Sequence, residues 1–164
     1  MLACHRVMFC VCLWLCGATL VHAGVPQLNK SCEDDRGRRV NVQVRYDSSR
    51  PYFAEADRDS RTGRYTIYVN PELYFLGRQT QQWLYLRQCG HIVLNHRVVQ
   101  DRVRGLRIED ERTADCWAAR RVLQSGGSSR TLYSIERDME RVIRENRWGR
   151  VLPGPQRRIS IRSC

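Results

Sequence analysis

The chain has 164 residues, of which 42% are hydrophobic and 27% charged, and this length suffices for one domain with a buried core. The composition excludes collagen-like, low-complexity and wholly disordered proteins. The formal net charge is +11, and every basic residue except Lys30 is arginine. The arginines are scattered, without a nucleic-acid-binding motif or interleaved aromatic residues, so we expect no nucleic-acid partner.

Residues 1–23 predict a secretory signal peptide. An apolar run at 7–21 follows a short polar start, and small Ala23 stands directly before the expected cleavage point. The run is shorter than the roughly 20 residues that cross a bilayer, although an uncleaved anchor helix is the alternative. We therefore expect one mature domain, residues 24–164, that is secreted or periplasmic and has no transmembrane segment.

Four cysteines lie in this mature domain: Cys32, Cys89, Cys116 and Cys164. An even number in an exported chain predicts two disulfides, for which three pairings are possible. Four buried free thiols, the pattern typical of a cytosolic protein, are the alternative.

Strands are predicted in the first part of the mature domain. Apolar and polar residues alternate over 38–46 and again over 64–69, which is the pattern of half-buried strands. The intervening residues 47–63 are polar and rich in turn formers, with a short additional strand possible at 52–54. A short helical turn is expected at 72–76.

Helices are predicted after the strands. Thr80 is the expected N-cap of the first, Ser128 or Ser129 caps the third, and residues 100–108 form a polar linker. The tail from Trp148 is expected to be irregular because it is rich in proline and glycine. Strands followed by helices indicate an α+β fold. The three helices are predicted at residues 81–98, 109–124 and 131–147.

Two pairs of polar residues share helical spacing on consecutive predicted helices. Arg87 and His91 are four residues apart, as are Glu111 and Asp115, so each pair occupies one helix face. Packed helices would bring the two pairs together. By spacing alone, such a group is either an interhelical ion-pair cluster or a functional site.

The segments at 86–96 and 111–119 resemble the active-site segments of gluzincin metallopeptidases. They are most similar to small exported HtpX-like bacterial proteins, whose pattern is H-E-C-G-H-H-x-x-G-H followed by E-x-x-A-D-C-W-A. The similarity extends over about residues 64–124, and the ending at 153–164 also looks familial. The resemblance implies a small N-terminal antiparallel or mixed sheet, followed by a zincin-like core of about three helices stapled by disulfides.

In the family, the two histidines of H-E-x-x-H and a later glutamate bind zinc, and the motif glutamate activates a zinc-bound water. This chain has Arg87 in place of the first histidine and Gln88 in place of the catalytic glutamate. His91 and Glu111 correspond to vestigial metal ligands, and Asp115 to the residue that supports the site. An amide cannot accept a proton from water, and two ligands are too few for a stable zinc site. No catalytic residue and no cofactor are therefore expected.

The position of Arg87 suggests a further hypothesis about its contacts. Loss of zinc would leave buried carboxylates without a counter-charge, which is costly. We expect the Arg87 guanidinium to occupy the vacated space and bind Glu111, Asp115 or both. His96, five residues after His91 and about 140° further round a helix, is expected to point elsewhere.

The resemblance also leads to a disulfide prediction. If the two helices meet through His91 and Glu111, the cysteines of their motifs should be neighbours. We therefore expect the pairs Cys89–Cys116 and Cys32–Cys164.

The function expected from these features is that of a secreted or periplasmic zincin-like protein without peptidase activity, acting as a binding or interaction module. One alternative is an active zinc metallopeptidase with a non-standard site. Another is a basic, disulfide-stapled protein that binds an anionic envelope component, such as a polysaccharide, a lipid or an acidic protein. The sequence names no substrate or partner.

Overall fold

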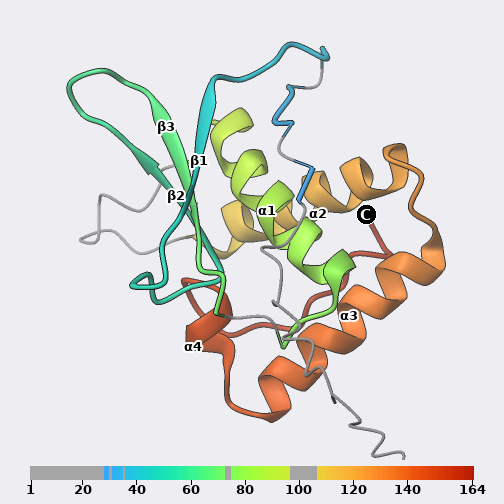
Figure 1. The fold of residues 1–164 in the computed structure, drawn as a ribbon. Helices are drawn as coiled ribbons and strands as arrows, with labels where there is room; N and C mark the ends of the chain where they lie inside the picture. The colour runs from blue at the N-terminus through green and yellow to red at the C-terminus, as the bar shows by residue number, and fades with distance from the viewer. Residues whose placement is uncertain (1–27, 30, 35, 73–74, 97–106) are drawn as a thin grey trace, which may run out of the picture.

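The structure is a computed structural model, and it describes residues 28, 29, 31–34, 36–72, 75–96 and 107–164. The predicted signal peptide and most of the predicted linker at 100–108 lie outside these residues. A three-stranded mixed sheet precedes the helices, which confirms the expected α+β fold (Figure 1). The elements are β1 (Val42–Tyr46), β2 (Ala54–Arg58), β3 (Tyr65–Val69), α1 (Arg78–Val93), α2 (Ile108–Gln124), α3 (Ser129–Arg144) and α4 (Trp148–Val151).

The sheet has the strand order β1-β3-β2, with β1 parallel and β2 antiparallel to β3. The central residue Ile67 is paired with Val44 on one side and Ala56 on the other, and it is fully buried. The strand β2 lies within the predicted turn-rich segment at 47–63, but it begins at Ala54, where the short strand expected at 52–54 was to end. Ala54 and Ala56 are buried, and so is Glu55 between them. Two small apolar residues next to Glu55, Asp57 and Arg58 give only a weak strand pattern.

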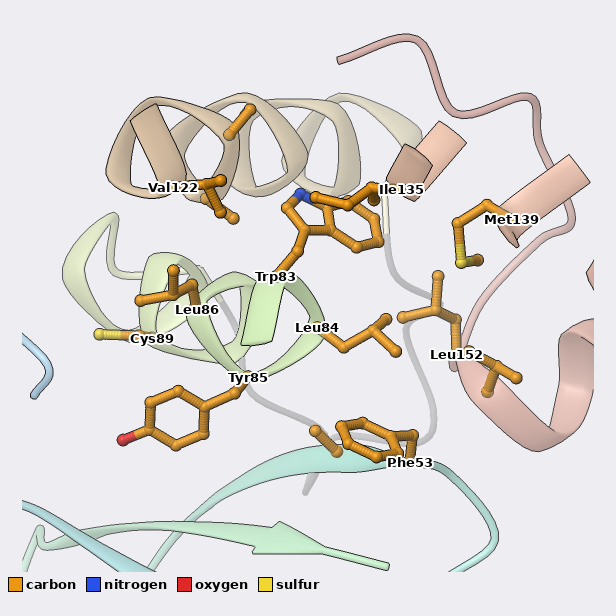
Figure 2. Close-up of a cluster of buried hydrophobic side chains, with 14 of the residues drawn as sticks. Phe53, Trp83, Leu84, Tyr85, Leu86, Cys89, Val122, Ile135, Met139 and Leu152 are labelled. Carbon is orange, nitrogen blue, oxygen red and sulfur yellow. The ribbon is translucent and has the colours of Figure 1, made fainter. Parts of the chain in front are cut away.

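Helix α1 lies at the centre of the molecule, between the sheet and the other helices (Figure 1). Its apolar side chains point in several directions, with Trp83 toward Val122 and Ile135, Leu84 toward Leu152, and Tyr85 toward the sheet (Figure 2). After the exposed residues Arg78 and Gln79, α1 is buried on most of its surface and has no solvent-facing stripe. This position explains why polar residues of α1 must find partners inside the protein.

The start of α1 differs from the prediction. The helix begins at Arg78 with Gly77 as its N-cap, and Thr80 lies within the first turn. The Asp138 carboxylate accepts hydrogen bonds from the Gly77 N–H (3.0 Å) and the Thr80 hydroxyl (2.6 Å). The cap is thus supplied by a side chain of α3, which local sequence could not indicate.

The end of α1 also differs, because the helix stops at Val93 instead of continuing to 98. Asn95 adopts a left-handed backbone conformation with φ of +54°. The His96 N–H donates to the His91 carbonyl (2.9 Å), and the Asn95 N–H donates to Ile92 (3.1 Å). These two hydrogen bonds form a Schellman motif, which ends a helix and reverses the chain. After glycine, asparagine is the residue that most readily adopts this conformation.

Three other local predictions have clear outcomes. Ser128 is the N-cap of α3, where its hydroxyl accepts from the Thr131 N–H. The described part of 72–76 forms turns and bends instead of a helical turn, and the tail contains the single-turn helix α4. In the part of the chain that the structure describes, no helix is both long and apolar enough to cross a membrane.

The disulfides join Cys32 to Cys89 and Cys116 to Cys164, so the predicted pairing is wrong. Arg87 lies on the face of α1 that packs against α2. Cys89 follows it by two residues, about 200° further round the helix, and therefore points away from α2. Its partner is instead Cys32 in the N-terminal segment, and Cys116 forms its disulfide with Cys164 in the C-terminal tail.

Candidate functional site

The two predicted polar pairs meet where α1 packs on α2. Gly90 permits this close packing, since a Cβ atom at that position would lie 3.1 Å from the Trp117 ring. Within one turn of Gly90, Arg87 and His91 project from α1 toward Glu111 and Asp115 of α2. The i, i+4 spacing in each helix therefore produces a single cluster.

Arg87 is fully buried and contacts both carboxylates, as predicted. Its Nε atom donates to Asp115 Oδ1 over 2.8 Å, and its Nη2 atom donates to Glu111 Oε2. The planar guanidinium can serve two acids at once because its donors diverge within one plane.

Arg157, which the sequence analysis did not identify, completes the cluster from the C-terminal tail. Its Nη2 atom lies 2.7 Å from Asp115 Oδ2, and its Nη1 atom lies 3.0 Å from Glu111 Oε2. Its side chain is only 5% exposed, and its Cζ atom lies 5.2 Å from the centroid of the Trp148 ring. Charge balance was the available signal, because two predicted buried carboxylates require more than one cation.

The cluster is electrically balanced, with two guanidinium groups opposite two carboxylates. Such balance is needed because an unpaired charge in the protein interior is strongly destabilising. Burial raises the pKa of Glu111 above its usual value, while Arg87 and Arg157 act in the opposite direction. The ionised state of Glu111 therefore depends on the two arginines.

His91 lies at the edge of this cluster, with its Nε2 atom 3.4 Å from Glu111 Oε1. Burial lowers the pKa of His91 well below its usual value of 6.5, and the positive charges of Arg87 and Arg157 add to this effect. His91 is accordingly a neutral imidazole at pH 7.

His96 lies beside His91, which corrects the expectation that it points elsewhere. The Nδ1 atoms of the two rings are 3.2 Å apart, and His96 Nε2 lies 3.4 Å from the Thr113 hydroxyl. The prediction assumed a continuous helix, whereas the chain reversal at Asn95 returns His96 toward His91. The sequence signal for this reversal was Asn95 itself.

Gln88 lies on a different face of α1 from Arg87. It is buried, and its Oε1 atom accepts a hydrogen bond from the Ala56 N–H in β2 over 3.2 Å. Gln88 therefore connects α1 to the sheet. Its amide can donate and accept hydrogen bonds but cannot act as a general base.

The residues at this site do not fit a bound zinc ion. Zinc requires three or four protein donors directed at one point. Across residues 28–72, 75–96 and 107–164, apart from Lys30 and Asp35, no three His, Cys, Asp or Glu side chains form such a group. Two guanidinium groups instead contact Glu111 Oε2, and their charge opposes binding of a cation.

Comparison of the chain with models of protein families, with curated proteins and with solved structures finds no match.

Proposed function

We propose that this chain is an exported zincin-like protein in which arginine has replaced the catalytic zinc, and that it acts as a binding module without peptidase activity. The observation that supports this proposal best is the position of Arg87. It stands where the motif has a zinc-binding histidine, it is fully buried, and it contacts Glu111, the residue that corresponds to the third ligand.

The remaining chemistry of the site agrees with the proposal. Peptide hydrolysis by a zincin needs a metal to polarise the carbonyl group and a base to activate water. Gln88 stands in place of that base and is hydrogen-bonded to the sheet. Arg87 and Arg157 supply the positive charge that a metal would otherwise contribute, which leaves Glu111 and Asp115 paired.

Metal analysis of the purified mature protein tests the proposal. We expect far less than one zinc per chain after dialysis against a weak chelator. Arg87→His should increase zinc uptake because it restores two histidines at i, i+4 spacing together with Glu111. Arg87→Ala is the matched control, since it removes the same charge without supplying a ligand. Both substitutions are repeated in a chain that also has Arg157→Ala, because Arg157 contacts Glu111 as well and its charge opposes zinc binding there.

A peptidase assay completes the test. The double substitution Arg87→His, Gln88→Glu should yield zinc-dependent cleavage of an unfolded protein substrate above the level of Arg87→His alone. One zinc per wild-type chain, retained through dialysis, would support the alternative of an active metallopeptidase. Failure of every variant to gain zinc would contradict the zincin relationship.

A further inference from the structure

A polar groove is lined by residues from the start of α1, the end of α2 and the start of α3. Figure 1 labels these three helices. It consists of two hollows of about 630 and 660 Å³ that adjoin, since Gln79 and Thr131 line both. We call it the helix-end groove. None of the residues of the Arg87 cluster lines it, so it is a separate feature of the surface.

One wall of the groove is a row of exposed residues on α3. Arg130, Tyr133, Ser134 and Arg137 follow the i, i+3, i+4, i+7 spacing of a single helix face, and all four are exposed. The two arginines are therefore two turns apart, about 10.5 Å along the helix axis. Tyr133 lies between them and is 45% exposed, one of two large hydrophobic side chains described as exposed.

The acidic side chains of the groove are already paired. Glu33 lies 3.4 Å from Arg121, a residue that also lines the groove. Asp138 caps α1 and forms an ion pair of 2.8 Å with Arg141. Neither acid therefore offsets the other arginines of the groove.

Three arginines of the groove retain an uncompensated charge. Arg78, Arg130 and Arg137 form no ion pair with a carboxylate of the described residues, and all three are exposed. Two arginines lie near the Tyr133 ring, with the Arg162 Cζ atom 5.0 Å and the Arg137 Cζ atom 6.0 Å from its centroid. The groove thus has a net positive charge and attracts anions.

The rest of the lining is rich in neutral hydrogen-bonding groups. The amide of Gln79 and the hydroxyl of Ser134 line the two hollows. Gln82, Gln124 and Thr131 also line them, but their side chains already form hydrogen bonds with Asn29, Arg121 and Ser128 respectively. Amides and hydroxyls both donate and accept, so they match a ligand that carries many hydroxyl groups.

We propose that the helix-end groove binds an acidic polysaccharide. Sulfate or carboxylate groups of the polymer pair with Arg78, Arg130 and Arg137, and a sugar ring packs on Tyr133. A polymer chain fits into a groove, whereas a flat membrane surface does not. A single exposed tyrosine is also unlike the series of aromatic rings on which nucleic-acid bases stack. The inference does not depend on the proposed loss of zinc, because it concerns other residues.

Binding of defined polymers to the full mature chain tests this inference. The probes are dextran sulfate and polygalacturonate, which distinguish recognition of sulfate from recognition of carboxylate. Neutral dextran is the control, because it is the polymer of dextran sulfate without the sulfate groups. Arg130→Ala, Arg137→Ala should weaken binding of the preferred polyanion roughly tenfold, since two charge-assisted contacts are lost. Arg61→Ala, Arg112→Ala is the matched control: it removes the same charge from exposed positions outside the groove and should have an effect below about threefold.

Tyr133 provides an independent variant. Tyr133→Ala should weaken binding, whereas Tyr133→Phe should retain it because the ring is kept. Equal losses in the groove variant and the matched control would overturn the site, as would absence of binding to both polyanions. Single-stranded DNA bound as tightly as the preferred polysaccharide would overturn the ligand class. Zinc content does not enter these measurements, so either proposal can fail alone.

Discussion

Arg87 is among the largest fully buried side chains of the described residues, and its charge is matched by two acids that the sequence placed on the next helix. Buried ion pairs add little to stability relative to a well-packed apolar core, but they are costly to break. A single substitution in this cluster should therefore have a large effect.

We expect Arg87→Ala to lower the free energy of unfolding by about 3–5 kcal/mol, because Arg157 alone would face both Glu111 and Asp115. Urea denaturation at pH 7 measures this change. Arg112→Ala, at an exposed position of α2, is the control and should stay within about 0.5 kcal/mol of wild type. A similarly small change for Arg87→Ala would contradict the buried pairing.

The neutral state of His91 predicts a dependence of stability on pH. The unfolded chain binds a proton near pH 6.5, whereas the folded chain does not, because burial and then Arg87, His96 and Arg157 lower the pKa of His91. This contribution is fully present above pH 6.5 and is lost as the pH falls below it. The slope is at most about 1.4 kcal/mol per pH unit.

Denaturation between about pH 5 and about pH 7.5 measures this slope, since most carboxylates stay ionised there. The pKa of His96 is also lowered by burial, so His96 acts in the same direction. His91→Gln should flatten the profile more than His96→Gln does. A wild-type stability that does not change over this range would refute the assignment of a neutral, buried His91.

At the scale of elements, the contact between α1 and α2 depends on Gly90. A methyl group there would lie 3.1 Å from the Trp117 ring and 3.4 Å from the Ala114 carbonyl oxygen, so the Trp117 ring would have to shift by a few tenths of an ångström. We expect Gly90→Ala to destabilise the fold by about 1–3 kcal/mol, despite the better helix propensity of alanine.

The matched control for this prediction is Gly149→Ala in α4. A Cβ atom at Gly149 has no neighbour within 4 Å, so alanine should be neutral or slightly stabilising. Thermal denaturation compares the two variants. Equal stability of both would show that the α1–α2 contact can accommodate a methyl group.

The helices α1, α2 and α3 all end in the same motif. Asn95, Gly126 and Asn146 each have positive φ after α1, α2 and α3 respectively, with the hydrogen bonds of a Schellman motif. Glycine is the most common residue at this position, so Gly126 indicates a helix end from the sequence alone. Asn95 indicates one less clearly, because apolar and basic residues continue after it. The prediction of a helix to residue 98 is the reason why His96 was expected to point away from His91.

At the scale of the whole molecule, the C-terminal tail contributes to the cluster through Arg157 and is attached to α2 by Cys116–Cys164. Tail residues Ile159 and Ile161 are also buried, and Glu136 accepts from the Ile161 N–H. The tail is thus part of the core. The disulfide fixes Cys164 to the residue that directly follows Asp115.

We expect Cys116→Ala, Cys164→Ala to lower stability by about 4 kcal/mol in the chain-entropy account, given the separation of 48 residues. Cys32→Ala, Cys89→Ala, which opens a loop of similar length, should cost a similar amount. Only the first variant should raise amide hydrogen exchange in residues 155–164, because it alone releases the tail. Exchange that rises equally in both would contradict this role.

Peptide mapping without reduction supplies the direct check of the pairing. We expect one peptide pair that joins Cys32 to Cys89 and one that joins Cys116 to Cys164. Recovery of a Cys89–Cys116 pair would instead support the pairing expected from the motifs alone.

The sequence by itself determined the α+β order, most of the helix and strand positions, and the meeting of Arg87 with Glu111 and Asp115. The element positions follow from local periodicity, which depends only on near neighbours in the chain. The meeting of the two pairs follows from i, i+4 spacing together with the expectation that consecutive helices pack on each other. Only the tertiary structure decided the disulfide pairing, the cap that Asp138 supplies to α1, and the presence of Arg157 in the cluster. Each of these joins segments far apart in sequence, and their contact depends on the direction in which packed side chains point.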